Sequence, residues 1–134
     1  MSNFISRVKE LNLPEGEFMV CGSAILDVLG IRKAQDIDIL VSPALFIELE
    51  KNGWKRSKRY PTTLEDPQGI SGAKQTLDFM KENYSLEQAL PLAIYIEGVP
   101  FMSLEMLVNA KTQLGREKDL IDIKLIKEYL KNQK

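Results

Sequence analysis

Residues 18–42, FMVCGSAILDVLGIRKAQDIDILVS, form the stretch that decides the fold of this chain. An apolar run ends at Gly22 and Ser23, a short helical pattern follows, and a second apolar run begins with Asp36 and Asp38. Short apolar runs bounded by glycine, serine and aspartate are typical of strands, and the spacing between them favours a helix. The stretch therefore predicts a strand–helix–strand unit that carries two carboxylates in its second strand.

The remaining chain repeats this alternation of helical and strand-like segments. We expect helices over residues 5–13, 23–31, 43–52, 103–114 and 116–133, with one further helical turn over 85–91. We expect strands over 17–22, 36–41, 53–60 and 74–80, a loop or irregular hairpin over 59–73, and a hairpin over 92–103. The predicted fold class is α/β (α+β): a single domain over residues 1–134, with a mixed sheet flanked by helices and a helical C-terminus.

The last predicted helix has the most marked apolar pattern. Its apolar residues are Leu120, Ile121, Ile123, Leu125, Ile126, Tyr129 and Leu130. At the helical period these side chains form one wide stripe, which predicts a side that faces the core.

The composition limits the classes of function. Of the 134 residues, 44% are hydrophobic and 28% are charged, which is typical of a globular protein. The absence of histidine excludes histidine-based zinc sites and catalytic triads, and a net charge of −1 argues against broad nonspecific binding of nucleic acid. With one cysteine, Cys21, no signal-peptide core and no apolar run near about 18 residues, we expect a cytoplasmic protein that binds no membrane.

The two aspartates indicate metal chemistry. Residues 36 and 38 of a strand project from the same face, roughly 6 to 7 Å apart, so the charges of Asp36 and Asp38 repel each other. A divalent cation relieves this repulsion, and Mg²⁺ prefers carboxylate, phosphate and water oxygens. Gly22 lets a ligand approach the backbone closely, and Ser23 with the first amides of the next helix can hold a phosphate. The stretch thus predicts a phosphate site beside a metal-binding carboxylate pair.

A third carboxylate completes this prediction. Asp78 lies at the centre of the predicted strand 74–80 and is expected beside Asp36 and Asp38. Two metal ions about 4 Å apart can activate an attacking hydroxyl and stabilise a departing pyrophosphate. We therefore expect Asp36, Asp38 and Asp78 to be the catalytic and metal-binding residues, holding one or two Mg²⁺ ions.

These motifs resemble the nucleotidyltransferase fold of the polymerase-beta superfamily. The resemblance rests on the Gly-Ser turn, the Asp-x-Asp strand and Asp78, and it covers about residues 17–130. The segment PFMSLEMLVNAKTQLGREKDLIDIKLI is similar to the C-terminal region of small bacterial and archaeal nucleotidyltransferase-like proteins. In that resemblance Lys111 lies on a helix whose counterparts face the triphosphate, and Lys118 is a second candidate for binding phosphate.

The resemblance implies a Mg²⁺-dependent nucleotidyltransferase. Such an enzyme moves a nucleoside monophosphate from a nucleoside triphosphate, expected here to be ATP, to a hydroxyl acceptor and releases pyrophosphate. The resemblance leaves three classes of acceptor: a small molecule, an RNA such as tRNA, or a partner protein. Because the chain is too short for a large acceptor-binding domain, we expect a homo-oligomer or a complex with a protein partner.

Two alternatives to this enzyme stay open. One is a catalytically silent nucleotide-binding module, or a regulatory module of the toxin–antitoxin type, on the same fold. The other is an unrelated α/β domain with incidental acids.

Each candidate residue also has a purely structural interpretation. The acid pair can supply solubility charges to an edge strand, the Gly-Ser turn can be only a helix cap, and Asp78 can be a turn residue. Lys111 can be solvated, and Arg116 and Lys118 can cap helix ends or pair with nearby acids of the last helix. Arg32, in the loop before the acid pair, can reach a phosphate or stay in solvent.

Overall fold

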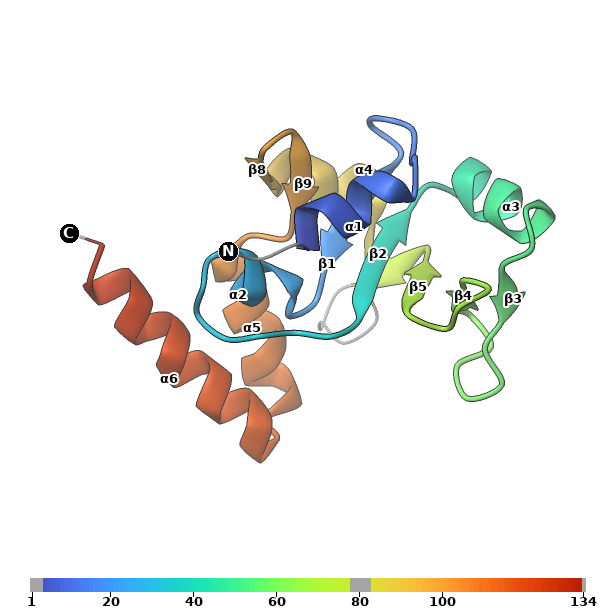
Figure 1. The fold of residues 1–134 in the computed structure, drawn as a ribbon. Helices are drawn as coiled ribbons and strands as arrows, with labels where there is room; N and C mark the ends of the chain where they lie inside the picture. The colour runs from blue at the N-terminus through green and yellow to red at the C-terminus, as the bar shows by residue number, and fades with distance from the viewer. Residues whose placement is uncertain (1–3, 78–82, 134) are drawn as a thin grey trace.

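The computed structural model describes residues 4–77 and 83–133, so the prediction for Asp78 falls outside the described residues. Within them the chain has a mixed α/β fold (Figure 1). The helices are α1 Phe4–Glu10, α2 Ala24–Val28, α3 Pro43–Lys51, α4 Leu86–Ala89, α5 Leu104–Leu114 and α6 Glu117–Lys131, with a 3₁₀ turn η1 at Leu90–Leu92. The strands are β1 Phe18–Cys21, β2 Ile37–Val41, β3 Lys55–Arg56, β4 Leu64–Glu65, β5 Ser71–Lys74, β6 Thr76–Leu77, β7 Tyr84–Ser85, β8 Ile94–Ile96 and β9 Val99–Phe101.

Strand β2 lies at the centre of a mixed sheet. The main sheet has seven strands in the order β3-β4-β5-β2-β1-β9-β8. β2 is antiparallel to β1 and parallel to β5, and β1 is parallel to β9. The other neighbours in this sheet are antiparallel, and β6 and β7 form a separate antiparallel pair. The prediction of a mixed sheet flanked by helices is therefore confirmed.

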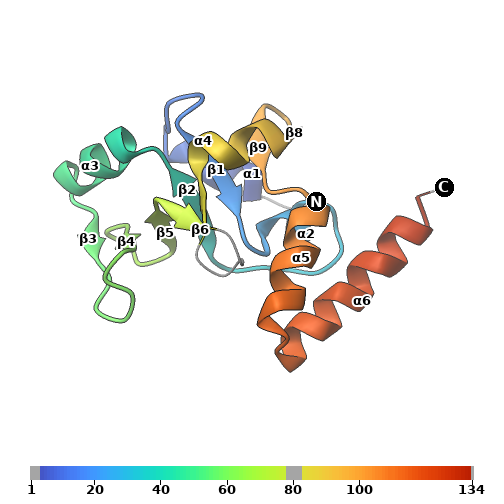
Figure 2. The ribbon, with the colours of Figure 1, turned by 180° about the vertical axis from the view of Figure 1, so that it is seen from behind.

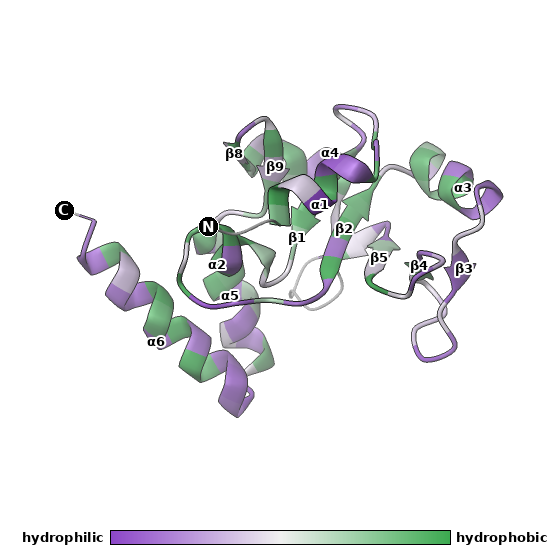
Figure 3. Ribbon diagram, in the orientation of Figure 1, coloured by the Kyte–Doolittle hydropathy of each residue, from purple (hydrophilic) through white to green (hydrophobic). Residues whose placement is uncertain are grey.

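The hydrophobic core lies on both faces of the central strands. Ile37, Ile39, Leu40 and Val41 of β2 are each at most 2% exposed. Helix α1 covers one face of the sheet and α4 covers the other, as the two opposite views show (Figures 1 and 2). Apolar residues are concentrated on β1 and β2 (Figure 3). Burial on both faces explains why β2 is apolar at every position except Asp38.

Cap residues set the ends of the longer helices. The side chain of Ser42 accepts a hydrogen bond from the Leu45 amide, and Pro43 occupies the first position of α3. Ser103 caps α5 in the same way, and Gly115 ends that helix with a φ of +60°, which glycine adopts without strain. The helix starts predicted at Ser42 and Ser103 are confirmed, because a cap acts through groups that are close in the sequence.

The segment that neighbours β2 differs from the one we expected. The hairpin that we expected as one alternative for residues 59–73 is present, since β4 and β5 pair antiparallel and β5 ends one residue beyond that range, but we did not expect β5 to pair with β2 in parallel. The predicted strand 74–80 is divided, since Lys74 ends β5 and residues 76–77 form β6 in the separate pair. The sequence Ser-Gly-Ala within β5 has low strand propensity, so pairing with a buried strand, and not local preference, makes it a strand.

The core-facing stripe predicted for the last helix is wrong in part. Three of its apolar residues are exposed: Leu120 (57%), Ile121 (56%) and Leu130 (49%). The buried residues of α6 are Asp119, Asp122 and Ile126. Helix α6 meets α5 near their connection and extends away from the sheet, with hydrophilic and hydrophobic residues mixed along it (Figures 1 and 3). No helix in the described parts of the chain combines the length and apolar character needed to cross a membrane.

Candidate functional site

The carboxylate of Asp38 lies close to glycines on both sides. Asp38 pairs with Cys21 of β1 on one side and with Gly72 of β5 on the other. A Cβ atom added to Gly22 would lie 3.1 Å from Asp38 Oδ2, and one added to Gly72 would lie 3.6 Å from Asp38 Oδ1. A side chain at residue 22 would therefore crowd the carboxylate, whereas a Cβ atom at residue 72 would meet the carboxylate at an ordinary contact distance and would first crowd Thr63, 3.3 Å from its Cγ2 atom.

The surroundings of Asp38 disfavour its charged form. Desolvation raises the pKa of its carboxyl, attraction to Lys74 opposes this rise, and repulsion from Asp36 adds to it. By surface area Asp38 is nevertheless exposed. Its carboxylate thus stands at the boundary of the protein, surrounded by protein atoms and open to solvent on one side. A cation bound on the open side would relieve both the desolvation and the repulsion.

Asp36 immediately precedes β2, whereas the prediction placed it inside the strand. Its side chain is exposed, and its charge is near enough to raise the pKa of Asp38. Among residues 4–77 and 83–133, no three His, Cys, Asp or Glu side chains form a group that could hold a metal. The described residues therefore supply a pair of carboxylates. The third acid that we expect, Asp78, lies outside them.

The turn between β1 and α2 lies against the same carboxylate. Gly22 has a φ of +70°, a left-handed conformation that other residues adopt only at a cost. Ser23 stands at the N-cap position of α2, but its side chain forms no capping hydrogen bond, so the predicted side-chain cap is absent. The Ser23 hydroxyl is therefore not used to cap α2.

Cys21 has a structural role beside this turn. Its thiol donates a hydrogen bond to the backbone carbonyl oxygen of Asp38, with Sγ 3.4 Å from that oxygen. Burial raises the pKa of the thiol to about 12. A buried thiol that stays protonated is a poor nucleophile, which together with this hydrogen bond favours a structural role for Cys21 in the pairing of β1 with β2.

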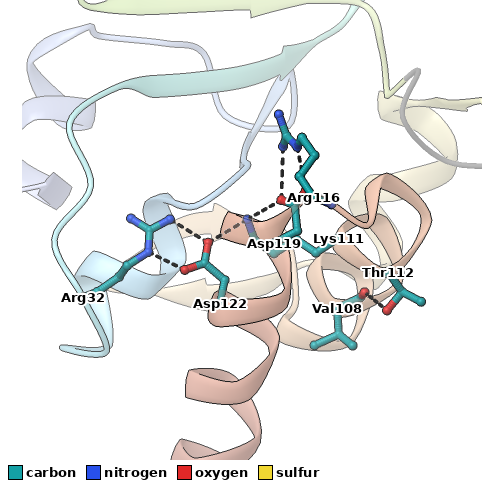
Figure 4. Close-up of polar contacts among 7 residues, drawn as sticks. All are labelled: Arg32, Val108, Lys111, Thr112, Arg116, Asp119 and Asp122. Atoms are coloured by element: carbon teal, nitrogen blue, oxygen red, sulfur yellow. Dashed lines mark hydrogen bonds and ion pairs between the residues drawn. The ribbon is translucent and has the colours of Figure 1, made fainter.

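A second polar cluster is buried between α5, α6 and the loop before β2 (Figure 4). Lys111 Nζ lies 2.9 Å from Asp122 Oδ2 and 3.6 Å from Asp119 Oδ1. Arg32 donates to both carboxylate oxygens of Asp122, at 2.6 and 2.7 Å. Arg116 donates to both oxygens of Asp119, at 2.6 and 3.1 Å. Three cations thus neutralise two buried acids, which explains how α6 can bury charged residues on its packed side.

The cluster stabilises the ionised form of both acids. The hydrogen bond from Arg116 is the main cause that lowers the pKa of Asp119. Burial acts to raise the pKa of Asp122, but hydrogen bonds from Arg32 and Lys111 outweigh it, and that pKa is lowered as well. Asp119 and Asp122 therefore differ from Asp38, whose charge is poorly compensated.

The two lysines expected to bind triphosphate lie in different surroundings. The side chain of Lys111 is 9% exposed and is paired with acids of α6, whereas Lys118 is exposed in the first turn of α6. Ion pairs connect Lys111 to Asp122 and, through Arg32, to the loop that leads to the acid pair. To reach a phosphate, Lys111 would have to leave its carboxylates. The nucleotide-binding role of both lysines stays a prediction.

Sequence reasoning missed Gly72 and the pairing of Arg32 with Asp122. A glycine inside a strand often marks close approach of another group, so Gly72 between Ser71 and Ala73 did carry a local signal. The pairing of Arg32 with Asp122 joins residues 90 positions apart and leaves no pattern within either segment.

Comparison of the chain with protein-family profiles, with curated proteins and with solved structures finds no significant match.

Proposed function

We propose that this protein is a Mg²⁺-dependent nucleotidyltransferase, which moves a nucleoside monophosphate from a nucleoside triphosphate, with ATP as the first candidate, to a hydroxyl acceptor. The observation that carries the proposal is the Asp38 carboxylate, which is desolvated between Gly22 and Gly72 and repelled by Asp36. This arrangement costs stability, and a bound divalent cation would relieve it. The order of β1, the Gly-Ser turn, α2 and the acid-bearing β2 supports the nucleotidyltransferase fold as part of the same proposal.

The residues around the acid pair have distinct roles in this proposal. Asp36 and Asp38 hold Mg²⁺ through carboxylate oxygens, the ligands that this ion prefers. Mg²⁺, when bound, supplies charge neutralisation for the triphosphate and for the departing pyrophosphate. Gly22 leaves its backbone accessible to a phosphate group, and the Ser23 hydroxyl can donate to a phosphate oxygen. The acceptor oxygen forms a bond to the α-phosphorus and its proton passes to solvent water, while the bond from the α-phosphorus to the oxygen that bridges to the β-phosphorus breaks and pyrophosphate leaves with that oxygen.

Three further parts of the proposal rest on the resemblance alone. Asp78 would be the third acid that holds Mg²⁺. Lys111 and Lys118 assist the triphosphate. The acceptor is a small molecule, an RNA or a partner protein, and a second copy or a protein partner completes its binding surface.

Calorimetric titration of the four nucleoside triphosphates, with Mg²⁺ and with EDTA, tests the proposal. The variants are Asp38→Asn and, as a matched control, Glu48→Gln, which removes an exposed carboxylate on α3. We expect Mg²⁺-dependent binding by the wild-type protein and by Glu48→Gln, and its loss in Asp38→Asn. Absence of binding to the wild-type protein would overturn the proposal.

A second measurement separates turnover from binding. The protein is incubated with triphosphate labelled at the α-phosphate and with fractions of small molecules, RNA and protein, and pyrophosphate release is followed. If the wild-type protein transfers label to one fraction and Asp38→Asn does not, that fraction contains the acceptor class. Mg²⁺-dependent binding without pyrophosphate release would instead identify the catalytically silent module.

A further inference from the structure

We infer that the ion pair between Arg32 and Asp122 positions Asp36 for metal binding, by tying the loop before β2 to helix α6. This inference rests on the proposed function, because Asp36 is one of the two carboxylates expected to hold Mg²⁺. Arg32 and Asp122 are positioning residues in this scheme, since they act through the backbone that carries Asp36.

The ion pair fixes orientation as well as distance. Arg32 Nε donates to Asp122 Oδ1 at 2.6 Å, and Arg32 Nη2 donates to Asp122 Oδ2 at 2.7 Å. Two parallel charge-assisted hydrogen bonds fix the orientation of the guanidinium relative to the carboxylate. A lysine has no planar pair of donors and could not fix this orientation. Arg32 Nη1 also donates to the carbonyl oxygen of Lys33 at 2.8 Å, so the same side chain shapes its own loop.

Asp122, the partner of Arg32, is held in a fixed position by its own surroundings. Its side chain is 5% exposed, and Lys111 Nζ of α5 lies 2.9 Å from its Oδ2 atom. Lys111 also contacts Asp119, one turn earlier on α6. A buried carboxylate that lost these cations would be left as an uncompensated charge, so the two helices hold Asp122 in one place (Figure 4).

Asp36 depends on its loop because its own side chain is exposed and lies outside β2. The Ala34 amide donates to Asp27 Oδ2 of α2 at 2.8 Å, and Arg7 Nη2 of α1 donates to the Gln35 carbonyl oxygen at 3.0 Å. These bonds hold the loop from the N-terminal helices. Backbone hydrogen bonds from the Arg32 amide to Leu26 O, at 3.3 Å, and from the Ile37 amide to Ile70 O, at 3.2 Å, hold its two ends. The Arg32 side chain adds the bond to α6, and we expect Asp36 to move more freely relative to Asp38 when that bond is removed.

The test compares Arg32→Ala with Arg116→Ala. Both variants remove a guanidinium that binds the same cluster bidentately, but Arg116 pairs with Asp119 three residues away and does not reach the loop. The probe is Mn²⁺ alone, and its free concentration is measured by electron paramagnetic resonance. We expect the Kd for Mn²⁺ to rise roughly tenfold or more in Arg32→Ala and to stay within about twofold in Arg116→Ala.

Two further readouts separate positioning from a loss of folding. In the Asp36→Asn background, Arg32→Ala should have no additional effect on the Kd for Mn²⁺, because the group that it positions is no longer a ligand. Amide hydrogen exchange of residues 33–36 should accelerate in Arg32→Ala and not in Arg116→Ala. Thermal unfolding defines a temperature at which every variant is folded.

The outcomes are distinguishable. Mn²⁺ binding that is lost in Asp38→Asn but unchanged in Arg32→Ala would overturn the positioning role and leave the proposed function intact. Equal weakening in Arg32→Ala and Arg116→Ala, or an Arg32→Ala effect that persists without Asp36, would also overturn it. A wild-type protein that binds no Mn²⁺ would overturn the proposed function and this inference together.

Discussion

The backbone of Gly22 approaches the carboxylate of Asp38 so closely that a Cβ atom on residue 22 would lie 3.1 Å from Asp38 Oδ2. Gly72 bounds the same carboxylate from the neighbouring strand, at 3.6 Å from a Cβ atom to Oδ1. An acid in a central strand is thus bordered by residues without side chains. Packing against Thr63, whose Cγ2 atom would lie 3.3 Å from a Cβ atom on residue 72, favours glycine in β5, whereas at residue 22 the positive φ and the carboxylate of Asp38 favour it.

Gly22→Ala is expected to reduce both the stability and the ligand binding of the protein. At a φ of +70°, an L-residue costs about 1–2 kcal/mol, and the new methyl group would press on Asp38 Oδ2. Urea unfolding measures the first effect, and calorimetry with Mg²⁺ and ATP measures the second.

Gly30→Ala is the matched control for this variant. Gly30 has a φ of +75°, and a Cβ atom there would meet nothing within 4 Å. Both variants should lose the free energy of unfolding that the positive φ costs, Gly22→Ala should lose more because of its contact with Asp38, and only Gly22→Ala should lose binding. A loss of binding in Gly30→Ala as large as that in Gly22→Ala would count against the proposed site.

Asp38→Asn is expected to stabilise the protein while abolishing metal binding. The raised pKa of Asp38 means that the folded protein carries its charge less readily than the unfolded chain does. Removing the charge should raise the free energy of unfolding at pH 7 by a few tenths to about 1 kcal/mol. Screening keeps this gain small, because Asp38 is exposed.

The pH dependence of this gain has a defined sign. A carboxyl whose pKa is raised by folding contributes stability below its unfolded pKa of about 3.9, and that contribution is lost as the pH rises through the folded pKa. The advantage of Asp38→Asn should therefore be absent at low pH and grow above about pH 4. Urea unfolding from pH 3 to pH 7 without divalent metal measures it. A variant less stable than the wild type at pH 7 would contradict the prediction.

Local chemistry explains which parts of the fold could be predicted. The starts of α3 and α5 depend on Ser42 and Ser103, whose hydrogen bonds reach only three residues along the chain. Strand β5 could not be predicted in the same way, because its Ser-Gly-Ala sequence has little preference for a strand and its partner β2 lies more than thirty residues earlier. The apolar stripe of α6 misled us, since helical periodicity identifies an amphipathic face but not what covers it.

In the candidate site, too, contacts within one segment could be predicted from the sequence and contacts between distant segments could not. Gly22, Ser23, Asp36 and Asp38 lie within one stretch, and their spacing alone predicts that they meet. Gly72 carried a local signal of close approach but none of which group approaches it, and the ion pair between Arg32 and Asp122 left no pattern within either segment, because both depend on the tertiary fold. Long-range ion pairs of this kind become visible only when the helices are placed.

Lys111→Met tests how far the buried cluster holds the two C-terminal helices. Removal of one partner leaves the carboxylates of Asp119 and Asp122 buried with less compensation, which typically costs roughly 3–5 kcal/mol. We expect a loss of that size in the free energy of unfolding, measured with urea. Lys118→Met, at an exposed position in the next helix, should change it by about 0.5 kcal/mol or less. Similar small effects for both variants would show that the cluster does not stabilise the helix pair.

The acid sensitivity of the protein should depend on the same cluster. Folding lowers the pKa values of Asp119 and Asp122 through their hydrogen bonds with Arg116, Arg32 and Lys111. A carboxyl with a lowered pKa contributes stability above its unfolded value of about 3.9, and that stability is lost as the pH falls through the folded pKa. The wild-type free energy of unfolding should therefore fall steeply below about pH 4.

Asp119→Asn isolates this contribution, because asparagine keeps the shape of the side chain and cannot ionise. Its free energy of unfolding should be lower than that of the wild type at pH 7, and the difference should narrow as the pH is lowered from 5 to 2. Glu48→Gln, which removes an exposed carboxylate on α3, should follow the wild-type curve throughout. Urea unfolding at each pH gives the three curves. If Asp119→Asn and the wild type lost stability in parallel, the ionised form of Asp119 would not be what the cluster stabilises.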